Sequence, residues 1–165
     1  MEVSYKFKYI EDNLVKLVQV LLVNENFKKL VYYLVDDPLS QPNVTVDLIE
    51  SGNVVLNLFD DGVLDEEKVT VFVNFMDGNF ERYPLSSLIF TIDIVVPYSK
   101  WALNGLGKLR ALSIFNEIAM DIDQKKVMGM TDAVVTRSKT SKVNNKYSAM
   151  TLGIKVNSSS MKGLR

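Results

Sequence analysis

The sequence predicts an α+β fold, in which an antiparallel β-sheet (a meander plus a C-terminal hairpin) packs against two or three α-helices. Apolar residues follow a helical period early in the chain and again over residues 106–123. Between and after these stretches lie segments rich in Val, Ile and Phe, which are typical of strands. The resulting order, α-α, β-β-β, α, β-β, places strands next to one another in the sequence and therefore favours this class.

The first helix is predicted over about Glu11–Val23. Its apolar face is formed by residues at positions i, i+3, i+4, i+7 and i+8, which are Leu14, Leu17, Val18, Leu21 and Leu22. Asn24 or Asn26 offers an N-cap for a second helix, whose apolar residues are Phe27, Leu30, Val31 and Leu34. Pro38 ends this helix, because the residue before a proline is pushed out of the α region.

Three strands are predicted next, over residues 53–59, 69–76 and 88–96. An acidic loop over residues 60–67 joins the first two strands, and Asp77-Gly78-Asn79 forms a turn. The third strand is nearly continuous in apolar residues apart from Asp93, so we expect it at the centre of the sheet.

A helix over residues 106–123 follows, and strands over 132–138 and 147–156 form a hairpin with Asn144-Asn145 at its turn. We expect one domain over residues 1–157, a basic hairpin protruding from it around 136–148, and a mobile tail over 158–165. The predicted core includes Leu17, Leu21, Leu30, Phe72, Ile92, Ile94, Ile114, Phe115 and Ile118.

The 165-residue chain contains no cysteine and no histidine. Their absence excludes disulfides, thiolate nucleophiles, zinc-thiolate sites and a Ser-His-Asp triad. Because histidine is also the commonest general base and metal ligand, we expect no enzyme activity, no cofactor and no small-molecule substrate. The N-terminus has no secretory pattern, and the most apolar stretch, Leu14–Val23, is too short to cross a bilayer, so we expect no membrane contact.

Charge is segregated along the chain. Residues 1–100 carry 16 acidic and 8 basic side chains, a net charge of −8, whereas residues 101–165 carry 4 acidic and 11 basic ones, a net charge of +7. Such asymmetry indicates a charged partner, either nucleic acid on the basic part or a second copy that pairs basic with acidic surface.

Four basic residues gather around the C-terminal hairpin, at Arg137, Lys139, Lys142 and Lys146. A two-stranded basic ribbon can enter a DNA groove, reach a neighbouring subunit, or serve as a solubilising surface. We favour a subunit arm, in which lasting affinity comes from apolar residues on the same strands: Val134, Tyr147, Met150 and Leu152. Trp101, the only tryptophan, either plugs the end of the sheet or anchors an interface.

Two further motifs carry possible chemistry. Asp61 with Glu66 and Lys68 loosely imitates the Mg²⁺ site of a nuclease, but we favour a solvated acidic loop before a strand. The segment Gly105–Arg110 places glycines and basic residues before a helix, where a phosphate could bind, but it lacks both the third glycine of a dinucleotide fingerprint and the Lys-Ser/Thr of a P-loop.

Residues 24–34 (NENFKKLVYYL) and 37–42 (DPLSQP) resemble the N-terminal pattern of neck proteins from tailed bacteriophages of Gram-positive hosts. The order of helix, three-stranded meander, helix and closing strands is similar to the tail terminator (tail completion) family. The likeness covers the first third of the chain by motif and the rest by the order of elements.

The resemblance implies a structural virion protein without an active site. Such proteins form a ring, usually a hexamer, which caps the tail tube, joins it to the head connector and lets viral DNA pass through its lumen. It further implies a location in the neck or upper tail of the virion, with synthesis in the host bacterial cytoplasm. A DNA-binding accessory protein that uses the basic hairpin is the alternative from another class.

Overall fold

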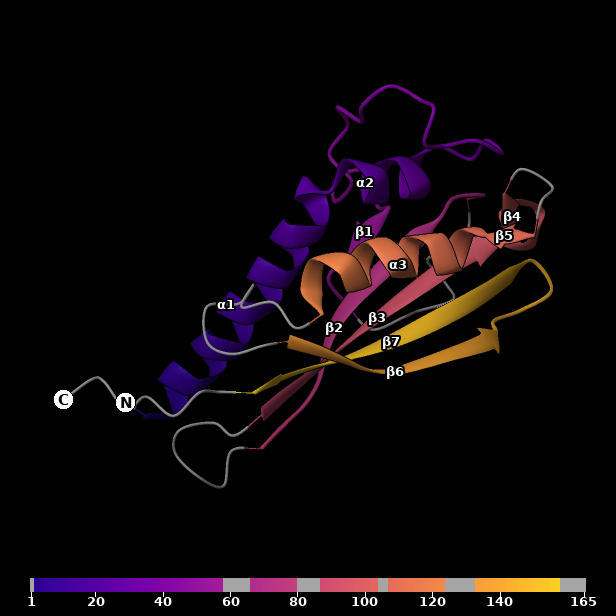
Figure 1. The fold of residues 1–165 in the computed structure, drawn as a ribbon. Coiled ribbons are helices and arrows are strands. Elements are labelled where there is room, and N and C mark those ends of the chain that lie inside the picture. Colours follow the sequence, from indigo (N-terminus) through magenta and orange to yellow (C-terminus); the bar gives the residue numbers. More distant parts are fainter. Residues whose placement is uncertain (1, 58–65, 80–86, 104–106, 124–132, 158–165) are drawn as a thin grey trace.

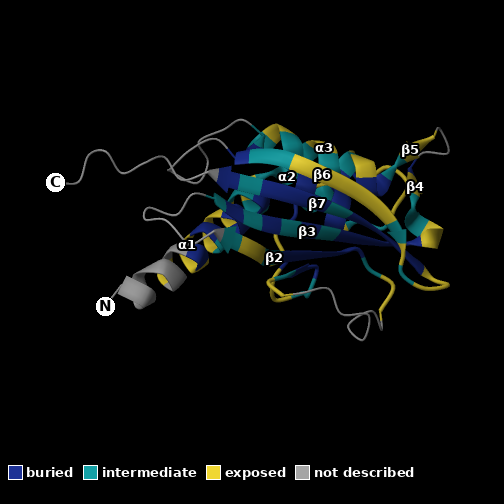
Figure 2. Cartoon of the chain, turned by 90° about the horizontal axis from the view of Figure 1, so that it is seen from below, coloured by how far each residue is buried: buried dark blue, intermediate teal, exposed yellow. Residues whose placement is uncertain are grey.

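The computed structural model describes residues 2–57, 66–79, 87–103, 107–123 and 133–157, and it confirms the predicted α+β class (Figure 1). Three helices pack on one face of a five-stranded sheet with the strand order β1-β2-β3-β7-β6. In Figure 2, the sheet is seen from its other face, which the helices leave open.

Helix α1 spans Glu2–Val23 and therefore begins nine residues earlier than predicted. Residues 2–10 contain no Gly or Pro to end the helix, and Lys8 Nζ lies 3.1 Å from Asp12 Oδ1, one turn away. Helix α2 spans Glu25–Tyr32, and Asn24 is its N-cap, since Asn24 Oδ1 accepts the Phe27 N–H at 3.0 Å. Neither these helices nor the third is long and apolar enough, in its described residues, to cross a membrane.

The four long strands of the sheet pair antiparallel with one another. They are β2 (Thr70–Asn79), β3 (Ser87–Pro97), β6 (Ala133–Lys142) and β7 (Tyr147–Asn157). Strand β3 is central, as predicted from its apolar run. The turn expected at residues 77–79 is wrong, because β2 continues through these residues after a bulge between Phe75 and Asp77.

The strand expected over residues 53–59 is much shorter. Only Val54–Val55 forms β1, and it pairs parallel to β2 rather than antiparallel. Parallel neighbours need a long connection between them. Near its end, this connection contacts β7, because the Tyr147 hydroxyl donates to the Glu66 carbonyl at 2.9 Å. The chain thus reaches the start of β7 before it returns to β2. Residues 58–65, which hold most of the predicted acidic loop, lie outside the described residues.

After β3, a short 3₁₀ turn (η2, Tyr98–Lys100) leads into the two-residue strands β4 (Ala102–Leu103) and β5 (Lys108–Leu109). Helix α3 spans Arg110–Ile122 and begins four residues later than predicted. Gly107 has a φ of +75° and Lys108–Leu109 pairs with β4, so the helix cannot start before Arg110.

The helices and the sheet share one main hydrophobic core. Eight of the nine predicted core residues are buried, whereas Phe115 is only half-buried and packs at the margin. Phe72 belongs to a second, smaller cluster with Val95, Tyr147 and Ala149. This cluster lies at one end of the open face, because register places these residues opposite to the helix-facing side chains of the same strands.

Candidate interface on the edge strand and the open face

The C-terminal hairpin is part of the sheet rather than a protruding arm. Strand β7 pairs with β3 over its whole length, from Tyr147–Pro97 to Asn157–Ser87. The turn is closed by Asn144, whose Oδ1 accepts the N–H groups of Lys146 at 2.7 Å and Tyr147 at 3.0 Å. The expected arm around residues 136–148 is thus replaced by an edge strand, β6, at the margin of the sheet (Figure 1).

All four predicted basic residues are exposed, but they do not share one surface. Arg137 and Lys139 pair with Gly153 and Thr151 and therefore lie on the open face. Lys142 is an odd number of residues further along the strand and lies on the helix side, and Lys146 lies in the turn. No ion pair within the described residues involves any of the four.

The apolar residues expected to hold a partner are already used inside the chain. Tyr147, Met150 and Leu152 are buried, and only Val134 remains partly exposed. The assignment of Tyr147, Met150 and Leu152 to an interface is therefore wrong: they face the two clusters of the monomer because β7 lies inside the sheet. A lasting contact at this ribbon needs another source of affinity.

The middle of the open face is polar. One row across β3, β7 and β6 consists of Asp93, Thr151 and Lys139, and the next includes Thr91, Gly153 and Arg137. The Thr151 hydroxyl donates to Asp93 Oδ1. Burial raises the pKa of Asp93, and the hydrogen bond from Thr151 opposes this shift in part.

Asp93→Asn is expected to raise the melting temperature at pH 7, because it removes a half-buried charge and keeps an acceptor for Thr151. A raised pKa means that the folded state binds the proton more tightly, so stability falls as pH rises from the usual value of 3.8 through the folded pKa. The gain should therefore vanish at acidic pH, where Asp93 is protonated in both states. Thermal unfolding at both pH values tests this, with exposed Asp37→Asn as control.

Trp101 is half-buried and packs against the main core. Its carbonyl accepts the Arg110 N–H at 2.8 Å, which joins the end of η2 to the start of α3. The structure therefore places Trp101 at the end of the sheet, where it packs against the main core.

Arg110 is the polar residue that sequence reasoning missed, and it is fully buried. Its guanidinium donates to the carbonyls of Leu30, Tyr33 and Val35 at 2.6–2.9 Å and to that of Lys100 at 3.0 Å. Burial lowers the pKa of Arg110, and the charge of Asp36 opposes this shift. Arg110 thus ties α3 to the C-terminal end of α2, and it cannot serve the phosphate site considered for residues 105–110.

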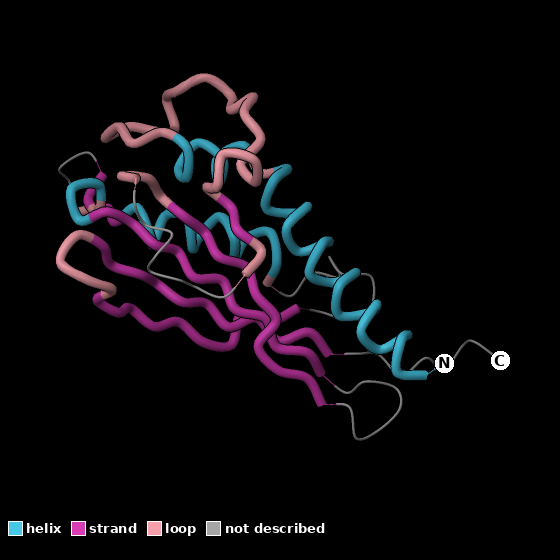
Figure 3. The backbone as a smooth tube through the Cα atoms, turned by 180° about the vertical axis from the view of Figure 1, so that it is seen from behind, coloured by secondary structure: helices cyan, strands magenta, loops and turns pink. Residues whose placement is uncertain are grey.

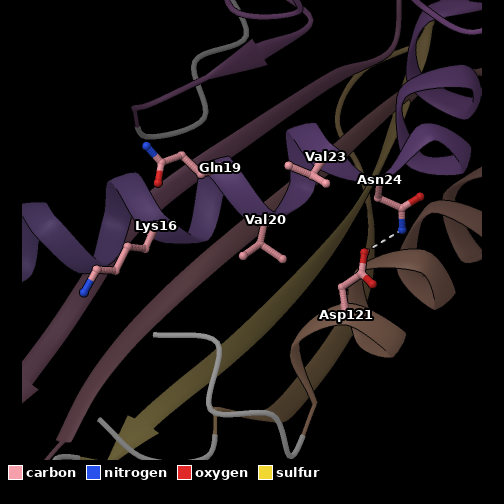
Figure 4. A pocket seen from close by; sticks show the side chains of 6 residues that line it. All are labelled: Lys16, Gln19, Val20, Val23, Asn24 and Asp121. Atoms are coloured by element: carbon pink, nitrogen blue, oxygen red, sulfur yellow. Dashed lines mark hydrogen bonds between the residues drawn. The ribbon is translucent and has the colours of Figure 1, made fainter. Parts of the chain in front are cut away.

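An open pocket of about 590 Å³ lies between α1 and α3 (Figure 4). Its lining residues are Lys16, Gln19, Val20, Val23, Asn24 and Asp121. At one end, the Asn24 amide donates to Asp121 Oδ2 at 2.5 Å and to Glu117 Oε2 at 3.1 Å. These polar groups hold the junction of α1 and α2 against α3, so a structural role accounts for them.

The nuclease interpretation gains no support from the residues that can be located. Lys68 Nζ donates to the Ser51 carbonyl at 3.2 Å and lies 3.7 Å from Glu66 Oε2, and Glu66 is exposed. Asp61 lies outside the described residues. Among the residues that the structure describes, no three or more Asp or Glu side chains are grouped so that they could hold a metal ion.

Comparison with the curated proteins gives no match. A protein-family model described as YomW matches residues 24–156, which include every element from α2 to β7. The chain belongs to the YomW family. The name YomW comes from a Bacillus prophage region, so membership of this family points to a phage-associated protein. The match begins at Asn24, the residue that caps α2 and contacts α3.

Proposed function

We propose that this YomW protein is a structural subunit of the phage particle, which assembles head to tail into a ring at the neck. In this role it caps the tail tube as a tail terminator or tail completion protein does. Its partners are further copies of itself, in a hexameric ring, together with tail-tube and head-connector proteins and the viral DNA in the lumen. The proposal includes no catalytic step and no cofactor.

The observation that carries the proposal is the separation of charge across the fold. Strand β6, at one edge of the sheet, carries Arg137, Lys139 and Lys142, all exposed. Exposed acidic residues lie on α1, on the segment after α2 and on β2: Glu11, Asp12, Asp36, Asp37, Asp47, Glu50 and Asp77. A head-to-tail contact needs two unlike patches on each copy, and this distribution supplies them.

Exposed apolar side chains support a contact on the acidic side. The segment between α2 and β1 exposes Val35, Leu39, Val46 and Ile49, each by more than two fifths of its surface. Apolar groups bordered by acidic ones suit a protein interface, in which charge guides the encounter and apolar burial slows dissociation.

Size-exclusion chromatography with light scattering tests the proposal. The wild type should form oligomers, and their fraction should fall with salt, since exposed charges are screened beyond about 8 Å at physiological ionic strength. Replacing Arg137, Lys139, Lys142 and Lys146 with Ser should slow assembly about tenfold without changing thermal unfolding, because the four side chains are exposed. Lys16→Ser with Lys108→Ser, two exposed residues elsewhere, is the matched control.

A chain that stays monomeric at every concentration, alone and with tail tubes, contradicts the ring. The alternative, a DNA-binding accessory protein, rests on the four exposed cations that have no ion pair within the described residues. It would be supported if the wild type bound duplex DNA with a salt slope of several units and the four-Ser variant lost that slope.

A further inference from the structure

The outer edge of β6 presents backbone groups that can take another strand. The Val143 N–H donates to the Tyr147 carbonyl at 3.1 Å, and hydrogen-bonding direction alternates along an antiparallel strand. The backbone groups of Lys139 and Ser141 therefore face β7, whereas those of Thr140 and Lys142 face outward. In the described part of the chain, no strand pairs with this outer side.

The two halves of β6 differ in how far other parts of the chain cover them. Near its start, the outward Val135 N–H is accepted by Asp123 Oδ1 at 3.0 Å, so the end of α3 occupies that part of the edge. After the bulge at residue 136, β6 is exposed almost continuously up to Lys142, which means that neither of its faces is covered (Figure 2). The available edge is thus the segment 137–142.

Pairing between two copies of β6 is unfavourable. An antiparallel β6–β6 contact about a twofold axis would bring Arg137 and Lys139 of one copy, which share the open face, against the same residues of the other. Like charges directly opposite each other destabilise a strand pair, and lysines on edge strands prevent such self-association. A strand that pairs here must carry acidic or neutral residues.

The opposite edge of the sheet fits this requirement. Strand β1 pairs only with Val71 and Phe72, so no described strand pairs with the outer side of β2 beyond them. This part of β2 contains no basic residue, and it exposes Asp77 together with Met76, which is 62% exposed. Figure 3 shows the edge from behind, with the β2 end of the sheet beside α1.

Strand direction allows the contact. Because each of β2, β3, β7 and β6 is antiparallel to the next, β2 and β6 run in opposite directions. A neighbouring copy in the same orientation therefore places its β2 antiparallel to β6. The open halves lie at opposite ends of the sheet, so neighbours must be shifted along the strands, which is the stagger that a closed ring of tilted strands requires.

We infer that the edge of β6 over residues 137–142 pairs with the outer edge of β2, over residues 74–79, in a second copy of this chain. The contact continues the sheet from one copy to the next and supplies the affinity that the buried residues of β7 cannot. Arg137 and Lys139 lie on the same open face as Asp77 of the neighbour and fix the direction of assembly. This inference rests on the proposed head-to-tail ring.

Thr140→Pro tests the backbone contact. Proline removes the outward N–H, and edge strands tolerate proline where the N–H faces solvent. The variant should melt within a few degrees of Thr140→Ala, yet it should remain monomeric under conditions in which Thr140→Ala assembles. Lys139→Pro removes an N–H that faces β7 and should lower the melting temperature. An equal fall for Thr140→Pro would place its N–H inside the sheet and overturn the inference.

Cross-linking provides a second measurement that does not depend on the proline variant. The chain has no cysteine, so thiols can be placed singly. Thr140→Cys together with Met76→Cys, treated with a short bismaleimide, should give a ladder of covalent multimers, because each copy then offers one thiol at each edge. Either single variant should give no dimer above the level of exposed Lys108→Cys.

The outcomes separate this inference from the proposed function. If the wild type assembles but the double-cysteine variant gives no ladder, the ring stands and the strand pairing is wrong. A dimer from Thr140→Cys alone would show twofold pairing of β6 and would also overturn the inference. If the wild type never assembles, the proposed ring fails and the pairing between copies fails with it.

Discussion

Replacing Arg110 with Ala is expected to lower the free energy of unfolding by about 3–5 kcal/mol, which urea denaturation would measure. The guanidinium donates to four backbone carbonyls. Those of Leu30, Tyr33 and Val35 lie in the last turn of α2 and directly after it, and that of Lys100 lies in η2. Without it, carbonyls at the negative end of α2 lose their partners inside the protein, and α3 loses its attachment to them. The side chain also leaves a cavity, since it is fully buried.

Arg110→Lys separates charge from geometry. A lysine keeps the positive charge, but its compact ammonium cannot reach carbonyls on two segments as the planar guanidinium does, so most of the loss should remain. Arg137→Ala is the matched control, since it removes an exposed arginine and should change stability by less than about 0.5 kcal/mol. A loss below about 1 kcal/mol for Arg110→Ala would mean that water replaces the guanidinium at little cost.

The hydrogen bonds of Arg110 could not be predicted from the sequence. Periodicity predicted the helix that contains it, but a side chain 75–80 residues away from its acceptors gives no local pattern. The structure places Arg110 at the first position of α3, where a basic residue opposes the helix dipole. The sequence did not give this signal, because it predicted a helix that starts at residue 106.

The strand predictions succeed where the sequence pattern is local and fail where pairing depends on distant segments. The apolar run around Ile92 and Ile94 predicted a central strand, and β3 does lie between β2 and β7. Burial is unequal on its two faces, since residues up to Asp93 alternate between half-buried and buried because the helices cover only one face. The direction of β1 could not be predicted, since a two-residue strand has no period. Its parallel pairing with β2 continues into the hydrogen bond from the Val71 N–H to the Asn53 carbonyl at 2.7 Å.

The candidate interface was predicted in composition but not in geometry. Exposure of Arg137 and Lys139 followed from their charge and position. Their face did not, because the bulge after Val135 reverses the alternation and turns them to the open side of the sheet. The continuous pairing of β7 with β3, which removes the protruding arm, is likewise a contact between segments about 60 residues apart.

Phe90→Ala is expected to lower the free energy of unfolding by about 3–5 kcal/mol. Phe90 lies on β3, is fully buried and packs edge-to-face on Phe75, with ring centroids 5.8 Å apart. Because β3 is held on both sides by long strands, its backbone cannot move into the space that the ring leaves, so the cavity should persist.

Phe115→Ala is the matched comparison, since it deletes the same ring from a half-buried position on α3. Water already reaches part of that ring, and the expected loss is about 1–2 kcal/mol. Urea denaturation of both variants, with the slope against urea compared to exclude a change in the unfolded state, measures the difference. Equal losses would contradict the placement of Phe115 at the margin of the core and of Phe90 at its centre. The contrast follows from position in the fold: a helix-facing side chain on the central strand is enclosed by strands on both sides and by the helices, whereas one on the margin of a surface helix is not.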